Sequence, residues 1–385
     1  MTITFFTNFI NHHQVPVADH LYSLLENDYH FVATEKVPQS FLDSGYPDFS
    51  KKPYLVKAYM GDNELEKAYQ LALDSDVVII GSAPDVFIEK RLATNKLTFR
   101  YSERWFRVRP YYLMSPRGWY NCYKQHLRYR HKELYMLAAS AYTANDVYHI
   151  GAYKNKTYKW GYFTAVPNLD IDMCLKRKAE KRIKILWCAR FLKLKHPELL
   201  PYLAQRLQLK GYDFEINMLG SGEEFIHTQE LISKLKVDSC VHLLGNVPNA
   251  HVLEMMRDHH VFLFTSDKNE GWGAVLNEAM SNGCTVVASN EIGAVPFLVK
   301  NGQNGLIFKS KNLDSLEECV ESLLKDHLLI EYLAKNAYST MRDCWSPETA
   351  TTNFLLLANS LLKENPIKIA NGPCSKATPC NAKKL

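Results

Sequence analysis

The second half of this 385-residue chain alternates short apolar runs with amphipathic segments, and this alternation restricts the possible folds more than any other feature. A short apolar run between turn residues is typical of a buried strand, whereas apolar residues recurring at helical spacing predict a helix. The predicted strands are 183–187, 214–219, 241–244, 261–265 and 285–289, and the predicted helices are 197–209, 230–235, 252–257, 274–281 and 294–299. This order predicts a doubly wound parallel sheet.

The first half shows the same order less clearly. Residues 3–8 form a predicted strand, a polar loop follows, and a helical pattern begins near Ala18. The apolar runs 76–81, 96–101, 135–141 and 147–150 extend this pattern. The chain is long enough to build two cores. We therefore predict an α/β protein with two Rossmann-like domains, each with a doubly wound parallel sheet.

We expect a domain boundary where a turn signal leads into the charged run 176–182. The predicted organisation is an N-terminal domain (1–168), a linker (169–181), a C-terminal domain (182–345), an apolar helix within 346–364 and a tail (365–385). The tail is rich in Pro, Lys, Asn, Ser and Ala and lacks an apolar period. That composition predicts a flexible, loosely attached segment.

The strongest local signal is Glu270-Gly-Trp-Gly-Ala-Val-Leu-Asn-Glu278, which follows a predicted strand and opens a predicted helix. The free N–H groups of a helix N-terminus favour a diphosphate, and Gly271 and Gly273 let the backbone approach a ligand closely. Glu278 can accept both hydroxyls of a ribose, and Glu270 can hold hydroxyls of a sugar. A capped, solvent-facing helix is the alternative, which the strand and the interleaved glycines disfavour.

A second signal is the pair of cations Arg190 and Lys195, which follow the predicted strand 183–187. The carboxyl end of a strand is where open α/β sheets bind ligands. Arginine offers a planar fork and lysine a point charge for phosphate oxygens. Because Lys193 lies in the same loop, a solvated basic loop is the alternative interpretation.

Taken in order, these motifs resemble the pattern of retaining glycosyltransferase family 4. The matching residues are Arg190 and Lys195, Gly220-Ser-Gly222-Glu223, Leu244-Gly245-Asn-Val-Pro248, Glu270 through Glu278-Ala279, and the segments 285–289, 296–299 and 301–308. The likeness covers about residues 181–345. Two positions depart from the family pattern. Ala189 replaces the usual glycine before the arginine, and His196 replaces the glycine after the lysine.

The resemblance implies the GT-B fold, in which two Rossmann-like domains face a central cleft and a final helix crosses back onto the first domain. It implies a retaining enzyme that uses no metal or other cofactor. Its donor is a nucleotide-diphosphate sugar, with UDP favoured and GDP possible. By resemblance, Arg190 and Lys195 hold the diphosphate, Glu278 the ribose and Glu270 the donor sugar. The further donor-binding residues implied are Gly271, Trp272, Gly273, Ala274, Val275, Gly222 and Val247.

The first domain departs more from the family. It lacks the glycine-rich loop after the first strand, and Asn11-His12-His13 stands in its place. Imidazole and amide donors could bind phosphate or acceptor hydroxyls there, although histidines in a turn are often simply exposed. Where many members carry a histidine near the reacting carbon, this chain has Glu103. Glu103 is our candidate polar partner for the donor sugar or acceptor, with a structural ion pair to Arg104 or another base as the alternative.

Residues Arg100–Lys132 combine basic and aromatic side chains around a single acid, Glu103. Basic residues near a surface attract anionic lipid headgroups, and aromatic residues favour the membrane interface. We expect peripheral contact with an anionic membrane and a saccharide or lipid-diphosphate-linked acceptor. The alternative to a membrane-binding segment is a solvated helical face with its aromatic residues in the core. Single-stranded nucleic acid also suits such mixtures, but no nucleic-acid module is recognisable and we expect no such partner.

The remaining composition places few restrictions on function. No apolar run is long enough to span a bilayer and no secretory leader is recognisable. The nine cysteines are dispersed without metal-binding spacing, as expected for reduced thiols in a cytoplasmic protein. We expect a cytoplasmic location, with possible peripheral attachment to the inner face of the membrane.

Three rival functions fit parts of the pattern. A GT-B nucleotide-sugar epimerase or hydrolase would share the fold, but the Glu270 and Glu278 pair favours a transferase. A nicotinamide dehydrogenase is disfavoured because Gly220-Ser-Gly222 lacks the full dinucleotide fingerprint. A non-catalytic sugar-nucleotide-binding scaffold stays open because the first domain is unusual.

Overall fold

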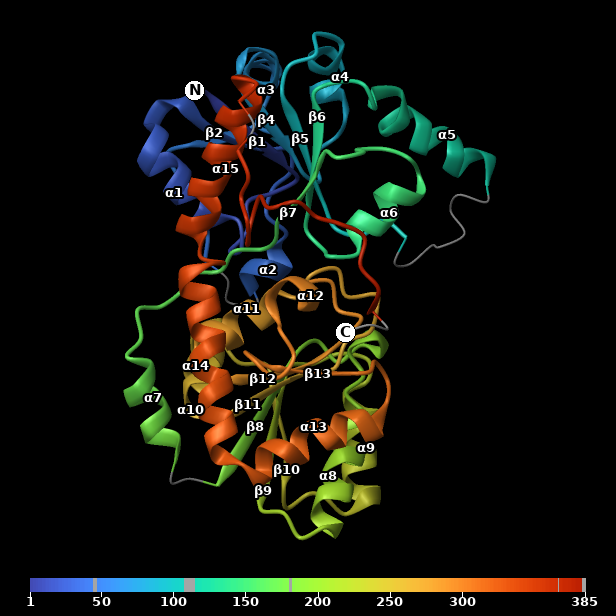
Figure 1. Ribbon diagram of the computed structural model, residues 1–385, viewed down its shortest axis with the longest axis vertical. Coiled ribbons are helices and arrows are strands. Elements are labelled where there is room, and N and C mark those ends of the chain that lie inside the picture. Colours follow the sequence, from blue (N-terminus) through green and yellow to red (C-terminus); the bar gives the residue numbers. More distant parts are fainter. Residues whose placement is uncertain (44–46, 107–114, 180–181, 366, 383–385) are drawn as a thin grey trace. The chain divides into compact units, whose positions relative to one another are not determined.

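The computed structural model describes residues 1–43, 47–106, 115–179, 182–365 and 367–382. The chain forms two compact units. Unit 1 contains Met1–Ala165 and Cys344–Cys380, and unit 2 contains Val166–Asp343 and Asn381–Leu385. Each unit is built around one parallel sheet with helices beside it (Figure 1).

Unit 1 contains a seven-stranded parallel sheet in the order β3-β2-β1-β4-β5-β6-β7. The strands are β1 (Ile3–Thr7), β2 (Tyr29–Ala33), β3 (Leu55–Lys57), β4 (Val77–Ile80), β5 (Thr98–Ser102), β6 (Leu134–Ala138) and β7 (Thr157–Lys159). β1 and β4, which are buried throughout, lie side by side in its centre. Strands buried on both faces read as continuous apolar runs, which is why these two were visible in the sequence.

Several helices of unit 1 bury apolar side chains on one face. The helices of unit 1 are α1 (Val15–Leu25), α2 (Gln39–Asp43), α3 (Asp62–Asp74), α4 (Val86–Ala93), α5 (Pro116–Gln125), α6 (Thr143–His149) and α15 (Pro347–Leu362). α15 packs against α1, and its fully buried Phe354 meets the ring of Phe99 at 5.2 Å between centroids. The helix begins at the Ser346 cap, whose hydroxyl accepts from the Thr349 N–H.

Unit 2 contains a six-stranded parallel sheet in the order β10-β9-β8-β11-β12-β13. The strands are β8 (Ile183–Cys188), β9 (Phe214–Leu219), β10 (Val241–Gly245), β11 (Val261–Phe264), β12 (Thr285–Ser289) and β13 (Leu306–Phe308). The helices are α7 (Ile171–Ala179), α8 (Leu199–Leu209), α9 (Phe225–Leu235), α10 (Asn249–Asp258), α11 (Ala274–Ser281), α12 (Val295–Leu298), α13 (Leu313–Lys325) and α14 (His327–Asp343). The prediction of two parallel α/β domains is confirmed.

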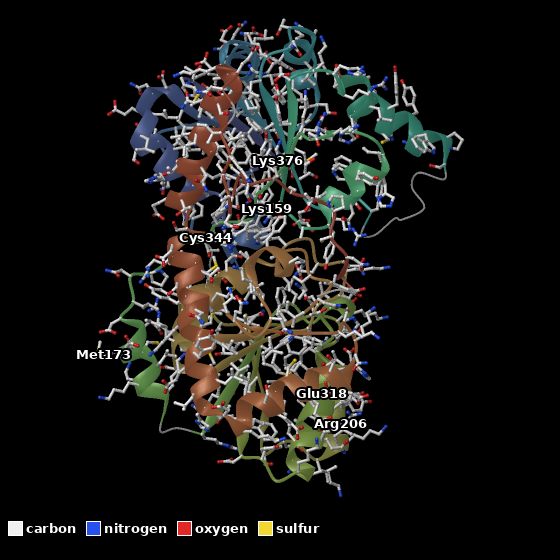
Figure 2. The ribbon with its side chains drawn as sticks, in the orientation of Figure 1. Lys159, Met173, Arg206, Glu318, Cys344 and Lys376 are labelled. Atoms are coloured by element: carbon white, nitrogen blue, oxygen red, sulfur yellow. The ribbon has the colours of Figure 1, made fainter. Side chains whose placement is uncertain are left out.

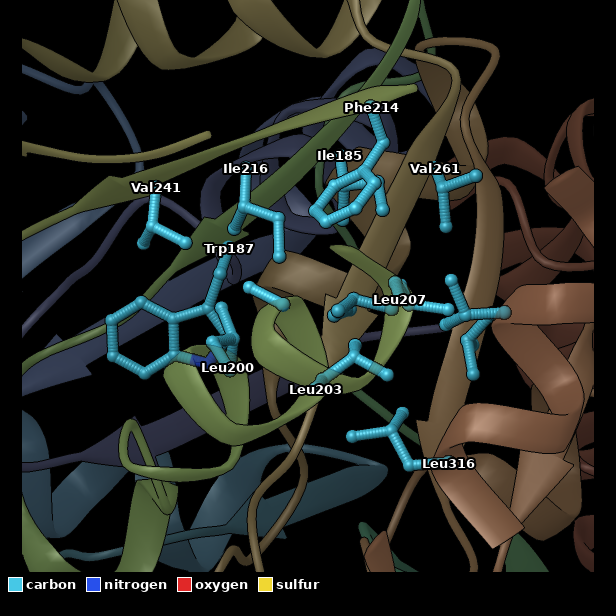
Figure 3. Packing of buried hydrophobic residues seen from close by; sticks show 14 of the residues in the cluster. Ile185, Trp187, Leu200, Leu203, Leu207, Phe214, Ile216, Val241, Val261 and Leu316 are labelled. Atoms are coloured by element: carbon cyan, nitrogen blue, oxygen red, sulfur yellow. The ribbon is translucent and has the colours of Figure 1, made fainter. Parts of the chain in front are cut away.

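One core of unit 2 lies between the sheet and α8 (Figure 3). Trp187, Ile185 and Ile216 extend from the central strands and pack with Leu203 and Leu207 of α8. All five are buried. Complete burial of a large aliphatic side chain contributes about 1.5–3 kcal/mol, so this core holds β8 and β9 rigidly behind the loops that follow them.

The segment 169–181, predicted as a linker, contains a helix that belongs to unit 2. α7 packs against α10 and α14. Its Lys178 is buried, and the ammonium donates to the carbonyls of Met256, His259 and Gly283 at 3.2, 2.6 and 2.9 Å. The charged run suggested a solvated linker because the sequence cannot show that one of its lysines has three buried acceptors.

The tail 365–385, predicted to be flexible, is packed within its described residues. Cys374 and Ser375 are buried, and the Cys374 N–H donates to the carbonyl of Lys159 at 2.7 Å. Lys376 pairs with Tyr158 in an antiparallel bridge, and its ammonium donates to the Tyr158 hydroxyl at 2.8 Å. Figure 2 marks Lys159 and Lys376 on these two segments. Backbone pairing along β7 thus orders a segment whose composition predicts disorder.

We predict that Lys178→Ala lowers the free energy of unfolding of the protein by about 2–3 kcal/mol, because three buried carbonyls lose a charged donor. Chemical denaturation followed by circular dichroism measures the change. Lys176→Ala on the same helix is the matched control, since its side chain is exposed. Equal stability of the two variants would contradict a structural role for the Lys178 contacts.

Candidate functional site

The loops that follow β8, β9 and β11 bring the predicted residues of unit 2 to one edge of its sheet. Parallel strands direct all their carboxyl ends to the same edge. β8 lies between β9 and β11, so the loop with Arg190 and Lys195 neighbours both the Gly220–Gly222 turn and the Glu270 turn. The sequence motifs, which are far apart along the chain, therefore gather at one place.

Lys195 and Glu270 form an ion pair at this edge. The Lys195 ammonium donates to Oε2 of Glu270, and both side chains are 14% exposed. The ammonium also lies 5.8 Å from the centroid of the Phe264 ring. Two residues expected to contact different parts of one donor are thus in direct contact with each other.

Hydrogen bonds from the end of β11 fix the backbone beside Lys195. The Thr265 hydroxyl donates to the carbonyl of Lys195 at 2.5 Å and accepts from the indole N–H of Trp187 at 2.9 Å. The Asp267 N–H donates to the carbonyl of Leu194 at 2.9 Å. Because Trp187 belongs to the core of unit 2, the Lys195 loop is anchored to a rigid part of the sheet.

Glu278 lies on α11 with little exposure to solvent. Its side chain is buried, and desolvation raises the pKa of its carboxyl to about 7. Cys188, at the end of β8, lies near it. Burial and the charge of Glu278 raise the pKa of the Cys188 thiol to about 12. A buried carboxyl is well suited to accept hydroxyl donors from a ligand that excludes water.

The glycines of the two turns are required by close packing. Gly273 has φ 91°, and a Cβ there would lie 2.3 Å from Cζ of Phe264. Gly220 has φ 124°, and a Cβ would lie 2.0 Å from the carbonyl oxygen of Ala189. Both the left-handed backbone and the contact exclude larger residues. These glycines let the loops after β8, β9 and β11 approach one another.

The other predicted donor-binding residues differ in exposure. Arg190 is exposed, Val247 is half-buried in the loop after β10, and Gly222, Gly271, Ala274 and Val275 lie in the turns or at the start of α11. The side chain of Trp272 is fully buried and its indole N–H donates to Asn277 Oδ1 at 2.9 Å, so the indole is part of the core of unit 2.

In unit 1, the loop after β1 and the loop after β5 are joined by a residue that sequence reasoning missed. The ring of His13 stacks on Tyr162 with centroids 3.8 Å apart, and the Tyr162 hydroxyl donates to Glu103 at 2.5 Å. Burial lowers the pKa of His12 to about 4, and burial together with His12 lowers that of His13 well below its usual value. Both imidazoles are therefore neutral near pH 7. No periodicity marked Tyr162.

The ion pair considered between Glu103 and Arg104 does not form. Arg104 Nε lies 3.4 Å from the buried Asp146 carboxylate on α6. Asp146 also accepts from the N–H groups of Trp105 and Phe106 at 2.8 and 3.1 Å. Asp146 thus holds the start of this loop, and Glu103 accepts a hydrogen bond from Tyr162.

Acidic residues from another segment pair with some of the basic residues of Arg100–Lys132. Residues 107–114, with Arg107, Arg109, Tyr111 and Tyr112, lie outside the described residues. Arg100 is 11% exposed and pairs with Asp85 at 2.8 Å, and Arg128 lies 3.4 Å from Glu89. Acids from α4 and its N-cap therefore neutralise part of the charge that the sequence appeared to leave unbalanced.

A smaller amphipathic surface remains on α5. Its aromatic residues Trp119, Tyr120 and Tyr123 are 49%, 64% and 54% exposed, while Gly118 and Cys122 are its buried residues. Arg117 and Lys124 are also exposed on this helix. We call the set Arg117, Trp119, Tyr120, Tyr123 and Lys124 the α5 surface. Three large aromatic side chains on one short helix are thus exposed to solvent instead of being packed in the core.

Comparison with known proteins places these features in a family. Residues 175–340 match the family model "Glycosyl transferases group 1", which includes the loops around Lys195 and Glu270. This segment is therefore a group 1 glycosyltransferase domain. Anabaena HepE in complex with UDP has the same fold as this chain, with a TM-score of 0.68, 14% identity, and coverage of 94% of this chain and 100% of that one. The chain has the GT-B fold.

Curated relatives match part of the chain. Poly(glycerol-phosphate) alpha-glucosyltransferase of Bacillus subtilis is 27% identical over 150 residues, which is 39% of this chain and 22% of that protein. The phosphatidylinositol N-acetylglucosaminyltransferase GPI3 subunit of Saccharomyces cerevisiae is 26% identical over 135 residues, which is 35% of this chain and 29% of that protein. The chain thus matches less than a third of each relative's length.

Two further features concern metals and membranes. Within the part of the chain that the structure describes, no three His, Cys, Asp or Glu side chains gather as metal ligands would. Among the described helices, none combines the length and apolar character needed to cross a bilayer.

We predict that the buried Glu278 makes the protein less stable as pH rises. The folded state holds a proton on Glu278 up to about pH 7, whereas the unfolded chain releases it near the ordinary glutamate pKa of 4.5. The free energy of unfolding should therefore fall by about 3 kcal/mol through this window from Glu278 alone. Denaturation of wild type and Glu278→Gln from pH 4.5 to 8 isolates the effect.

In Glu278→Gln, this contribution to the pH dependence should disappear. Glu230→Gln, an exposed change on α9, is the matched control and should follow the wild type. An unchanged pH profile in Glu278→Gln would show that the carboxyl is ionised in the folded state.

Proposed function

We propose that this protein is a retaining glycosyltransferase that moves a sugar from a nucleotide-diphosphate donor to a saccharide or lipid-linked acceptor. A UDP-sugar is the favoured donor and a GDP-sugar the second possibility. The Lys195–Glu270 ion pair carries the proposal, because it lies at the carboxyl edge of the sheet inside the segment that matches the family. The names of the relatives favour a role in surface polysaccharide or glycoconjugate synthesis.

The donor would replace one half of this ion pair. The diphosphate would take the Lys195 ammonium together with the exposed Arg190 guanidinium, and it would release Glu270 to accept hydroxyls of the donor sugar. Glu278 would hold the ribose, and the N–H groups at the start of α11 would face phosphate oxygens. The site would thereby select the donor over a simple anion. The donor can hydrogen-bond the buried Glu278 carboxyl and also pair with the Lys195 ammonium, whereas a simple anion can pair only with the ammonium.

The leaving group is the nucleoside diphosphate, so its negative charge grows as the reaction proceeds. Arg190 and Lys195 would stabilise that charge, and the proposal therefore uses no metal or other cofactor. In the proposed step, the bond from the anomeric carbon to the phosphate oxygen breaks and a bond to the acceptor oxygen forms on the same face. The proton of the acceptor hydroxyl passes to the leaving phosphate. Because the new bond forms on the face from which the phosphate departs, the anomeric configuration is preserved.

In unit 1, we propose that Asn11, His12 and His13 contact the acceptor and that Glu103 is a polar partner for the acceptor or donor sugar. The chain His13–Tyr162–Glu103 supports this assignment, because it holds the loops after β1 and β5 in a fixed arrangement. The two histidines are neutral, so they suit hydroxyl groups better than they suit phosphate.

A GT-B epimerase or hydrolase and a non-catalytic scaffold are the alternative functions. An epimerase or hydrolase would consume the donor without an acceptor, whereas a transferase needs one. Release of nucleoside diphosphate measured with and without a saccharide acceptor separates the first case. A scaffold would bind the nucleotide and release no product under either condition.

We further propose that the protein meets an anionic membrane surface through the segment Arg100–Lys132, as a peripheral protein on the inner face of the cytoplasmic membrane. The α5 surface supports this idea, because it combines exposed rings with two exposed cations. Aromatic rings favour the interfacial region and cations favour anionic headgroups.

We predict that Lys195→Ala and Glu278→Ala each weaken binding of the donor nucleotide by about tenfold to a hundredfold. Lys195→Ala removes a charged donor and Glu278→Ala removes a buried hydrogen-bonding carboxyl, each worth about 1.5–3 kcal/mol. A thermal-shift screen against UDP, GDP, ADP and dTDP identifies the nucleotide, with and without Mg²⁺. A ligand at about 100 times its Kd should add about 2.7 kcal/mol of stability to the wild type.

Lys193→Ala is the matched control for this experiment, because Lys193 lies in the same loop and is exposed. It should bind nucleotide like the wild type. Normal affinity in Lys195→Ala and Glu278→Ala would refute the site, and a shift that requires Mg²⁺ would refute the metal-independent proposal.

For the membrane proposal, we predict that Arg117→Ala/Lys124→Ala reduces flotation with phosphatidylglycerol vesicles by about 30-fold, at about 1 kcal/mol for each cation. Trp119→Ala/Tyr120→Ala/Tyr123→Ala should also reduce binding. Tyr148→Ala/Tyr332→Ala, which removes two exposed rings elsewhere, should not. Equal binding to purely phosphatidylcholine vesicles, or no binding to either, would exclude this role for the α5 surface.

A further inference from the structure

His196 occupies a backbone position that favours glycine. Its φ and ψ are 50° and 52°, in the left-handed region, directly after Lys195. A side chain in this region costs about 1–2 kcal/mol relative to ordinary backbone, although histidine tolerates it better than most residues. The family pattern has glycine at this position, and glycine would adopt the same backbone conformation without strain. In this chain the position carries a histidine side chain despite that cost.

Both ring nitrogens of His196 face carboxylates. Nδ1 lies 2.8 Å from Glu198 Oε1 at the start of α8, and Nε2 lies 3.4 Å from Asp267 Oδ2 after β11. A neutral imidazole has one N–H and can donate to only one of these acids, whereas the imidazolium can donate to both. The His196 side chain is 15% exposed and that of Asp267 is 6% exposed, which limits competition from water.

Asp267 connects the two halves of the candidate donor site. Its Oδ1 accepts from the Asn269 N–H at 2.9 Å, and its carbonyl accepts from the Glu270 N–H at 3.0 Å. Its own N–H donates to the carbonyl of Leu194. A contact from His196 to Asp267 therefore links the loop of Lys195 to the turn that carries Glu270.

We propose that His196 is a positioning residue whose imidazolium ties the Lys195 loop to the Asp267 turn, so that affinity for the donor diphosphate falls when His196 loses its proton. This inference rests on the proposed function, because it assigns pH sensitivity to the same donor site. It adds a residue to that site where the family pattern has glycine.

The charges around His196 oppose one another. Burial lowers the pKa of His196, and Lys311, whose ammonium lies 2.9 Å from Asp267, lowers it further. The hydrogen bonds and charges of Glu198 and Asp267 raise it, and the net pKa is raised. Lys193 and Lys195 lie in the same loop as His196, and Lys195 pairs with Glu270 of the turn after β11. The contact is therefore fully present in mildly acidic solution and is lost as pH rises through the raised pKa.

His196→Gly tests the inference without straining the backbone, since glycine suits the left-handed conformation. The probe is UDP or GDP, whichever stabilises the wild type, and calorimetry gives Kd for both proteins from about pH 6 to pH 9. The ratio of the two Kd values cancels the ionisation of the phosphate and of Glu278. We expect the variant to bind about tenfold more weakly at about pH 6, with the ratio approaching 1 at about pH 9.

Glu198→Gln provides a second variant that keeps the histidine. Removal of this charge should lower the pH at which the wild-type advantage over His196→Gly disappears, because one carboxylate no longer favours the imidazolium. A His196→Gly ratio that stays constant with pH would overturn the inference and leave the proposed function intact. Failure of the folded wild type to bind either nucleotide at any pH would overturn both.

Discussion

The buried carboxylate of Asp267 joins segments of unit 2 that lie far apart in the sequence. Lys311 and His196 approach one of its oxygens and the N–H of Asn269 donates to the other, while its backbone links Leu194 to Glu270. A carboxylate with little access to water must keep such partners, because its desolvation is otherwise unfavourable. The hydrogen bonds that Asp267 needs therefore hold together the two loops that carry Lys195 and Glu270.

Desolvation also affects Glu278, which lies at the same edge of the sheet as Asp267. The core around Trp187 and the packed glycine turns bring three loops close together, which leaves Glu278 buried and Cys188 partly buried. The raised pKa of Glu278 follows from this loss of solvent. The Lys195–Glu270 pair lies at the same edge, and its two side chains are also little exposed.

In unit 1, acidic side chains also hold loops in place through hydrogen bonds. Asp146 holds the loop after β5 through two backbone N–H groups, and Tyr162 joins Glu103 to His13. Acids that are distant in sequence, Asp85 and Glu89, offset basic residues that looked unbalanced. The α5 surface remains exposed, because the buried residues of this helix are the small residues Gly118 and Cys122.

The sequence by itself determined the class of fold. Buried parallel strands such as β4, β8 and β11 are continuous apolar runs, and the matched helices and glycine turns follow them at family spacing. The strands β2, β3, β7 and β13 and several helices, α7 among them, were not predicted. β3, β7 and β13 have only three residues each, and the charged composition of α7 conceals its burial. The motif residues Arg190, Lys195, Glu270 and Glu278 were also readable, since glycine and charge at fixed spacing are local properties.

Only the tertiary structure decided how those residues meet. It buried Trp272, paired Lys195 with Glu270, ordered the tail along β7 and made Asp267 the partner of His196. Each of these outcomes depends on contacts between segments that are distant along the chain. Burial and hydrogen-bond partners follow from those contacts, and no periodicity or composition within one segment specifies them.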